Sequence, residues 1–136
     1  MYDIKWIKDN VHIFDKGMEK RGIPSVSKNV LELHDVYVNL LSNLQDIQNE
    51  RNNASKNIGI KKSKGEDVSE EINKVSELKK NISSLQEKCN TIQTEIKTIL
   101  EVIPNIPSND TPVGADDSSN QEIKTCGKKI DFSYEP

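Results

Sequence analysis

Basic residues gather, without any acidic one, in a short window near the middle of the chain. Residues 51–65 read RNNASKNIGIKKSKG, and the cations in the window are Arg51, Lys56, Lys61, Lys62 and Lys64. The whole chain of 136 residues has a formal net charge of −3 at pH 7, so these cations stand against an acidic background. Such a cluster favours the binding of phosphate groups, as on a nucleic-acid backbone.

Helix capping offers a second explanation for part of this window. Lys61, Lys62 and Lys64 precede Gly65, a residue typical of the position just after a helix, so they would lie in its last turn. Cations there offset the negative end of the helix dipole by about 0.3 to 1 kcal/mol each. Capping accounts for these three lysines and leaves the two earlier cations unexplained.

A stripe of small and polar residues lies beside those two earlier cations. Asn52, Ser55, Gly59 and Lys62 follow one another at intervals that bring them to one side of a helix. A glycine inside a helix costs about 1 kcal/mol relative to alanine, so a close approach is expected to compensate for Gly59. The approaching group is either a second helix or a nucleic-acid backbone.

Lys79 and Lys80 extend the basic region into a later segment. Lys80 follows Glu77 by three residues and Lys74 follows Glu70 by four, so both lysines can form ion pairs within a helix. Lys79 has no acidic residue three or four positions away, which leaves it freer to bind a partner.

Arg51 is the one polar member of an otherwise apolar series. Its stem is expected to pack among apolar neighbours while the guanidinium reaches the surface, where it meets either RNA or a carboxylate such as Glu50 or Glu77. The predicted RNA-binding residues are Arg51, Asn52, Ser55, Lys56, Gly59, Lys61, Lys62, Lys64, Lys79 and Lys80.

The sequence offers no arrangement suited to catalysis. It has no Ser/His/Asp or Cys/His combination, no phosphate-cradling glycine loop and no metal-ligand spacing, and Cys89 and Cys126 are expected to be free thiols. We therefore predict no catalytic residue, no metal and no cofactor in this chain. It also lacks the apolar run of about 18 residues that a membrane helix requires, so no transmembrane helix is expected. The free thiols favour a reducing cytosol, so we expect a cytoplasmic protein without membrane contact.

Two long apolar series determine the predicted fold. The first ends before Gly65 and the second follows it, so two helices, at 28–64 and 67–103, are expected to form an antiparallel coiled-coil hairpin about 50 Å long. Asp67, with Glu70, is the predicted cap of the second helix. The first series is Val30, Leu33, Tyr37, Leu40, Leu44, Ile47, Arg51, Ala54 and Ile58. The second is Val68, Ile72, Val75, Leu78, Ile82, Leu85, Cys89, Ile92, Ile96, Ile99 and Ile103, with a local overwinding at 72–75–78.

The two ends of the chain complete an all-α prediction. Residues 3–22 are expected to form one or two short helices, capped by Asp3 and Asn10, that pack at the base of the hairpin. Pro104 begins an irregular linker, 104–136, in which two short strands around Gly127 are possible. The predicted division is a domain at 1–103 followed by this linker.

The stretches DIKWIKDN (3–10), ERNNASKNIG (50–59), IPNIPSNDTPVGADDSSN (103–120) and KKIDFSYEP (128–136), in this order, resemble the N-terminal domain of bacterial-type seryl-tRNA synthetases, class II aminoacyl-tRNA synthetases. One departure is Val11, where the family usually has proline. In that family the hairpin is an arm that holds the long variable arm and elbow of serine tRNA. The resemblance implies a parent ligase that uses ATP and Mg²⁺ and works as a homodimer, each arm presenting tRNA to the other subunit.

The resemblance also implies a catalytic domain that would begin after Pro136. This chain is therefore expected to be the arm and not the enzyme, to pack against its own catalytic domain in the parent, and to be a monomer by itself. The alternative is a structural or protein-docking hairpin, which would place apolar contacts at the tip. Ile60 is the only obvious apolar residue expected to be exposed there.

Overall fold

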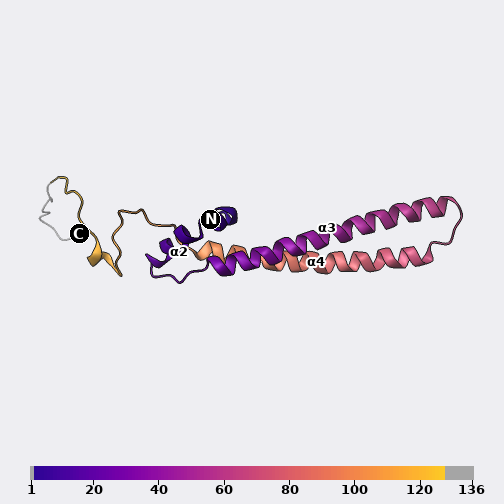
Figure 1. Ribbon diagram of the computed structural model, residues 1–136, viewed down its shortest axis with the longest axis horizontal. Coiled ribbons are helices and arrows are strands. Elements are labelled where there is room, and N and C mark those ends of the chain that lie inside the picture. The colour runs from indigo at the N-terminus through magenta and orange to yellow at the C-terminus, as the bar shows by residue number, and fades with distance from the viewer. Residues whose placement is uncertain (1, 128–136) are drawn as a thin grey trace, which may run out of the picture.

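The computed structural model describes residues 2–127 and is a long rod with short helices at one end (Figure 1). The helices are α1 (Ile4–Asp9), α2 (Val11–Glu19), α3 (Ser27–Ser63) and α4 (Ser69–Val102), followed by the short 3-10 helix η1 (Asp117–Ser119). Residues 2–127 contain no strand. The predicted all-α architecture is confirmed.

Helix α3 runs to the tip of the rod, where a short turn connects it to α4, and α4 returns alongside α3 (Figure 1). Every member of the predicted α3 series is buried or half-buried. Gly65 turns the chain at φ 74°, a left-handed conformation that glycine adopts without strain. The antiparallel coiled-coil hairpin predicted from the apolar spacing is therefore confirmed.

The prediction for the start of the α4 series was wrong at one position. Ile72 is 52% exposed, whereas Glu71 is half-buried and forms an ion pair with Lys61. With Glu71 in place of Ile72, the series runs Val68, Glu71, Val75 at heptad spacing, and no local overwinding is needed. Lys61 likewise continues the α3 series beyond Ile58, so the seam, which is the line of contact between the two helices, contains an ion pair near the tip.

Helix α4 begins two residues later than predicted. The residue at its N-cap is Val68, which contributes no side-chain cap, and the predicted capping box with Glu70 does not form. Asp67 lies one position earlier and accepts hydrogen bonds at its Oδ1 from the backbone nitrogen and the hydroxyl of Ser69, at 3.0 and 2.7 Å. Asp67 thus stabilises the turn that precedes the helix.

The predicted N-terminal cap forms in α1 but not in α2. The Asp3 carboxylate caps α1 by accepting from the backbone nitrogens of Lys5 and Trp6, as predicted. Asn10 occupies the N-cap position of α2, but its side-chain amide donates to the carbonyl of Trp6 at 3.0 Å. The prediction that Asn10 caps α2 was wrong because its amide closes α1.

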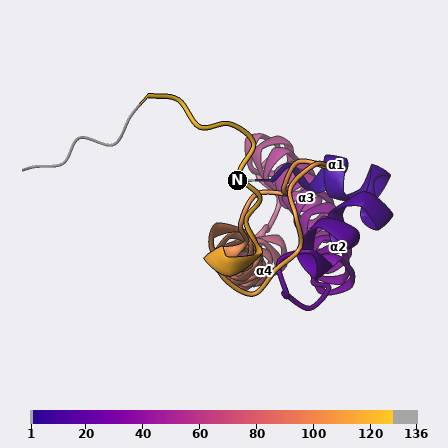
Figure 2. The ribbon, with the colours of Figure 1, turned by 90° about the vertical axis from the view of Figure 1, so that its left-hand side faces the viewer.

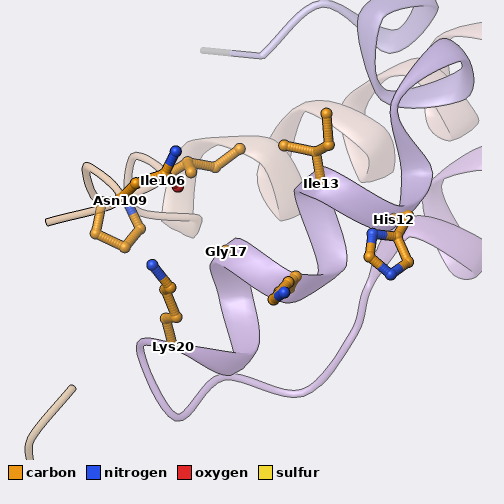
Figure 3. Close-up of a pocket in the computed structure, with 8 residues that line it drawn as sticks. His12, Ile13, Gly17, Lys20, Ile106 and Asn109 are labelled. Atoms are coloured by element: carbon orange, nitrogen blue, oxygen red, sulfur yellow. The ribbon is translucent and has the colours of Figure 1, made fainter. Parts of the chain in front are cut away.

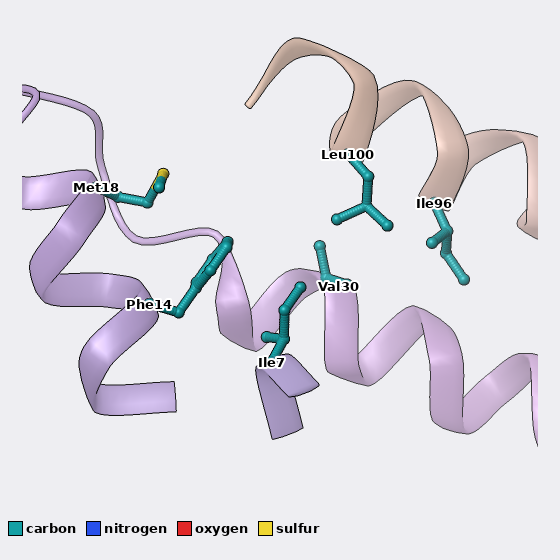
Figure 4. Close-up of a cluster of buried hydrophobic side chains, with 6 residues drawn as sticks. All are labelled: Ile7, Phe14, Met18, Val30, Ile96 and Leu100. Carbon is teal, nitrogen blue, oxygen red and sulfur yellow. The ribbon is translucent and has the colours of Figure 1, made fainter. Parts of the chain in front are cut away.

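The main hydrophobic core lies at the base of the rod, where α1 and α2 pack against the hairpin (Figure 2). Burying each large side chain there contributes about 1.5 to 3 kcal/mol. Tyr2 joins this core, with its ring edge-on to Phe14 at 5.1 Å and its hydroxyl donating to the carbonyl of Pro104 at 2.9 Å. The buried cluster, drawn in Figure 4, consists of Ile7, Phe14, Met18, Val30, Ile96 and Leu100.

The chain that leaves α4 packs along α2 before it departs from the base. Ile106 rests on the buried Gly17, where an added Cβ would lie 2.8 Å from the Ile106 Cγ1 (Figure 3). The first part of the predicted linker is therefore attached to the base. Residues 121–127 form no strand; the rest of the predicted strand pair, 128–136, lies outside the described residues.

Substitution of two helical glycines tests this packing. Gly17→Val should lower the free energy of unfolding by about 1 to 3 kcal/mol, because the new side chain displaces Ile106. Gly59→Val is the matched control: no atom lies within 4 Å of an added Cβ there, so stability should stay within about 0.5 kcal/mol. Urea unfolding followed by circular dichroism measures both changes, and equal stabilities of the two variants would contradict the packing.

Candidate nucleic-acid interface

The heptad spacing gives the hairpin two distinct flanks. Labelling Val30 and Val68 as heptad position a puts Glu50 and Lys74 both at position g. In an antiparallel pair, the g positions of the two helices lie on one flank and the e positions on the other. The Glu50–Lys74 ion pair, at 2.7 Å, joins the helices across the g flank and supports this assignment.

The opposite flank carries the small-residue stripe. Ser55 and Lys62 are at e on α3, and Lys79 is at e on α4, so they share one side of the hairpin. We call this side the stripe face. It consists of Asn52, Ser55, Gly59 and Lys62 on α3 with Ile72 and Lys79 on α4, and all six are exposed.

The other predicted RNA-binding residues are distributed around the rod. Lys56 and Lys80 are exposed at position f, on the outer surfaces of the two helices. Lys64 is exposed on the g flank, at the C-cap of α3. Arg51 and Lys61 are half-buried in the seam. The structure thus brings together on one face the stripe and Lys79 but not the complete predicted set.

Lys61 is directed toward the partner helix. Its ammonium pairs with the Glu71 carboxylate, and this hydrogen bond, reinforced by the opposite charge, raises the pKa of Lys61. The same hydrogen bond lowers the pKa of Glu71. Lys61 therefore holds the tip of the hairpin together, which goes beyond the helix-dipole role expected from its position.

Arg51 does not meet a carboxylate anywhere in residues 2–127. Its Nη2 donates to Oδ1 of the neighbouring Asn52 at 2.7 Å, and the residue is half-buried at a seam position of α3. Of the two carboxylates considered for it, Glu50 pairs with Lys74, and Glu77 forms no ion pair in this part of the chain. The guanidinium therefore lies against the first residue of the stripe.

Two ion pairs allowed by the sequence do not form. Lys74 pairs across the hairpin with Glu50 and not with Glu70, and Lys80 does not pair with Glu77. Within the described range 2–127, five of the predicted lysines, like Arg51, have no carboxylate within 4.0 Å: Lys56, Lys62, Lys64, Lys79 and Lys80. These exposed lysines are available to an anionic partner.

Gly59 is not explained by helix packing. A Cβ built at Gly59 has no atom within 4 Å, so the residue is not required for a close approach of α4. The helix–helix explanation offered by the sequence is therefore wrong. The glycine does leave the helix surface open between Ser55 and Lys62.

The base of the rod has hollows of a different character. One of about 360 Å³ lies between α2 and the chain that follows α4, next to Gly17 and Ile106 (Figure 3). Among residues 2–127 no group of three or more His, Cys, Asp or Glu side chains is arranged to hold a metal ion. Over the same range, each helix is too short or too polar to cross a lipid bilayer.

Comparison with known proteins identifies the family. The model of the seryl-tRNA synthetase N-terminal domain matches residues 1–107, which include the whole hairpin and Ile106. The chain belongs to this family. Serine–tRNA ligases of Beijerinckia indica subsp. indica and Methylocella silvestris are 38% and 36% identical to it over its whole length.

A solved structure agrees with this assignment. Seryl-tRNA synthetase from Pyrococcus horikoshii, in complex with ATP, superimposes on 88% of this chain with a TM-score of 0.77 and 31% identity. The chain covers 28% of that protein, and it spans 32% and 30% of the two ligases. It corresponds to about a third of each relative.

Sequence reasoning missed the surface position of Ile72 and the seam position of Glu71. The signal was present in the spacing, because Glu71 follows Val68 and precedes Val75 at regular heptad intervals. Lys61 follows Ile58 in the same way, which would have indicated a charged pair facing across the hairpin.

The Lys61–Glu71 pair predicts a defined pH dependence. Because the folded-state pKa of Glu71 is lowered, its stabilisation is present above the ordinary value of about 4.3 and is lost as pH falls through the lowered pKa. The raised pKa of Lys61 preserves the pair up to strongly alkaline pH. In urea unfolding, wild type should exceed Glu71→Gln in stability at neutral pH, and the difference should shrink in acid.

The Lys61→Met background provides the control for this measurement. There Glu71→Gln should have little effect at any pH, because the partner is absent. Glu66 and Glu70 also act on Lys61, and Asp67 acts on Glu71, but all three remain in every variant. An equal loss in both backgrounds would show that the pair does not stabilise the tip.

Proposed function

We propose that this chain is the tRNA-binding arm of a serine–tRNA ligase and that its distal half holds the long variable arm and elbow of serine tRNA. Membership in the seryl-tRNA synthetase N-terminal domain family supports an arm of this kind. The observation that carries the proposal is the group of exposed lysines near the tip, which find no carboxylate in residues 2–127 although the chain is acidic overall.

Phosphate neutralisation supplies the affinity in this proposal. Lys62 and Lys79 lie on the same face of the rod but on different helices, so they can contact phosphates on the two sides of a groove or on successive turns of a backbone. Each contact releases condensed counterions, so binding weakens as salt rises. The distal stripe has no aromatic side chain on which bases could stack, which favours recognition of the backbone and its shape.

The stripe itself provides a surface on which the RNA backbone can lie close to α3. Gly59 lets a sugar–phosphate backbone approach the helix without meeting a side chain, while Asn52 and Ser55 offer hydrogen-bonding groups beside it. Arg51, held against Asn52, brings a guanidinium to the same place. Lys56, Lys64 and Lys80 surround the stripe face and add to its attraction for RNA without sharing its surface.

The chemistry of serine attachment belongs to the rest of the ligase in this proposal. ATP and Mg²⁺ would be bound by a catalytic domain that follows residues 104–136, and residues 1–103 would form the tRNA-binding domain. The parent would act as a homodimer in the cytoplasm, with each arm presenting tRNA to the partner's active site. This chain by itself would be a non-catalytic monomer with serine tRNA as its ligand.

A protein-docking hairpin is the alternative function. Exposed apolar residues at the tip would favour it, and the structure shows two, Ile60 and Ile72, where the sequence indicated only Ile60. They lie on opposite flanks, since Ile60 is at position c beside the g flank, so they do not form one apolar patch. The unpaired lysines therefore favour RNA over a protein partner.

Charge reversal distinguishes the two functions. Lys62→Glu and Lys79→Glu should each weaken binding to a tRNA with a long variable arm, and each should reduce the slope of log affinity against log salt by about 1. Lys56→Glu should also weaken binding, through the field around the stripe. Titration of fluorescent tRNA at several salt concentrations measures these effects.

Lys88→Glu is the matched control for Lys79→Glu. Lys88 is exposed on the same helix but at position g, nearer the base and on the opposite flank, so its reversal should change affinity much less. A tRNA that lacks a long variable arm should bind more weakly to the wild-type chain. Unchanged affinity in Lys62→Glu and Lys79→Glu would show that the stripe face is not the RNA-binding site.

A further inference from the structure

In the first turn of α4, either Glu71 or its neighbour Ile72 could occupy the seam position that faces α3. Glu71 occupies it and is half-buried, while Ile72 is 52% exposed on the stripe face. By hydrophobicity alone the order should be reversed, because burial of an isoleucine is favourable and burial of a carboxylate is not.

Two features favour the observed arrangement. With Glu71 in the seam, α4 keeps an unbroken heptad from Val68 to Val75, whereas Ile72 would require a local overwinding. Lys61 also stands at the matching seam position of α3, and its ammonium pairs with the Glu71 carboxylate. A carboxylate becomes acceptable in a partly buried position when a cation is paired with it there.

The position of Ile72 relative to the stripe follows from this pair. Because Lys61 faces Glu71 across the hairpin, Ile72 lies at the level of Gly59 and Lys62. All three are on the stripe face, where the glycine leaves the neighbouring surface open. Ile72 thus adds an apolar side chain to a surface that is otherwise polar and basic.

We propose that Glu71 is a positioning residue for the RNA interface, and that its pair with Lys61 fixes the rotation of the first turns of α4 so that Ile72 stays on the stripe face. When the pair is absent, α4 rotates locally, Ile72 enters the seam against Ile58, and the stripe face loses its apolar residue. The role in RNA binding rests on the proposed function, whereas the rotation does not.

The rotation can be measured on the free chain by NMR of isoleucine methyl groups. A soluble paramagnetic reagent broadens exposed methyls, so wild-type Ile72 should behave like Ile60, which is 55% exposed. In Glu71→Ala and in Lys61→Met, Ile72 should become as protected as Ile82, the half-buried seam isoleucine of the same helix. Nuclear Overhauser effects between Ile72 and Ile58 should strengthen at the same time.

The charge-swapped variant Lys61→Glu with Glu71→Lys separates the pair from side-chain size. It rebuilds an ion pair at the same two positions, so Ile72 should again be exposed. If Ile72 remains exposed in both single variants, or remains protected in the swap, the pair does not set the rotation and the proposal is wrong. Circular dichroism confirms that each variant is folded before it is compared.

RNA affinity then tests the consequence for binding. Glu71→Ala removes a negative charge and releases Lys61, so charge alone predicts tighter binding to tRNA, whereas loss of Ile72 from the stripe face predicts weaker binding. Weaker binding that recovers in the swap supports the positioning role, and tighter binding overturns it. A wild-type chain that fails to bind tRNA would contradict the proposed function alone, because the NMR result is obtained without RNA.

Discussion

The seam between α3 and α4 is the constraint on which the rest of the structure depends. Only 33% of the residues are hydrophobic, and among residues 2–127 the distal part of each long helix packs only against the other long helix. A two-helix seam uses positions a and d and leaves the others in solvent. The seam therefore fixes which residues of α3 and α4 share a flank, and so it defines the stripe face.

The base and the tip use this constraint differently. At the base, α1 and α2 supply extra apolar side chains, and the chain after α4 is held by contacts such as Ile106 on Gly17. Within residues 2–127 no third element packs at the tip, where the seam contains the Lys61–Glu71 pair and the buried Val68 next to the turn at Gly65. A packed base and a distal half that exposes unpaired lysines suit an arm that reaches a ligand far from its anchor.

The sequence alone predicted the features that depend on residues close together in the chain. The regular spacing from Val30 to Ile58, the glycine turn and the Asp3 cap each depend on neighbours in the chain, and all three were predicted correctly. The hairpin and the stripe followed from these patterns. The grouping of Lys79 with the stripe required the observed register of the two helices.

The errors arose where a distant residue decides the outcome. The spacing of apolar residues predicted that Ile72 lies in the seam. That spacing contains no information about the ion pair that Glu71 forms with Lys61 on the other helix. Asn10 is an exception with a local cause, because its amide donates to the carbonyl of Trp6, four residues earlier, and does not cap α2. The segment after Pro104 was predicted to be an irregular linker. Ile106 in this segment packs on Gly17 of α2, a contact between residues far apart in the sequence.

Backbone amide shifts on titration with serine tRNA would show directly whether this tRNA lies on the stripe face. We expect small shifts on the g flank at Glu50, Asn57 and Lys74, and the largest shifts on the stripe face at Asn52, Ser55, Gly59, Lys62, Ile72 and Lys79. Larger shifts on the g flank, or shifts confined to the base of the rod, would contradict it.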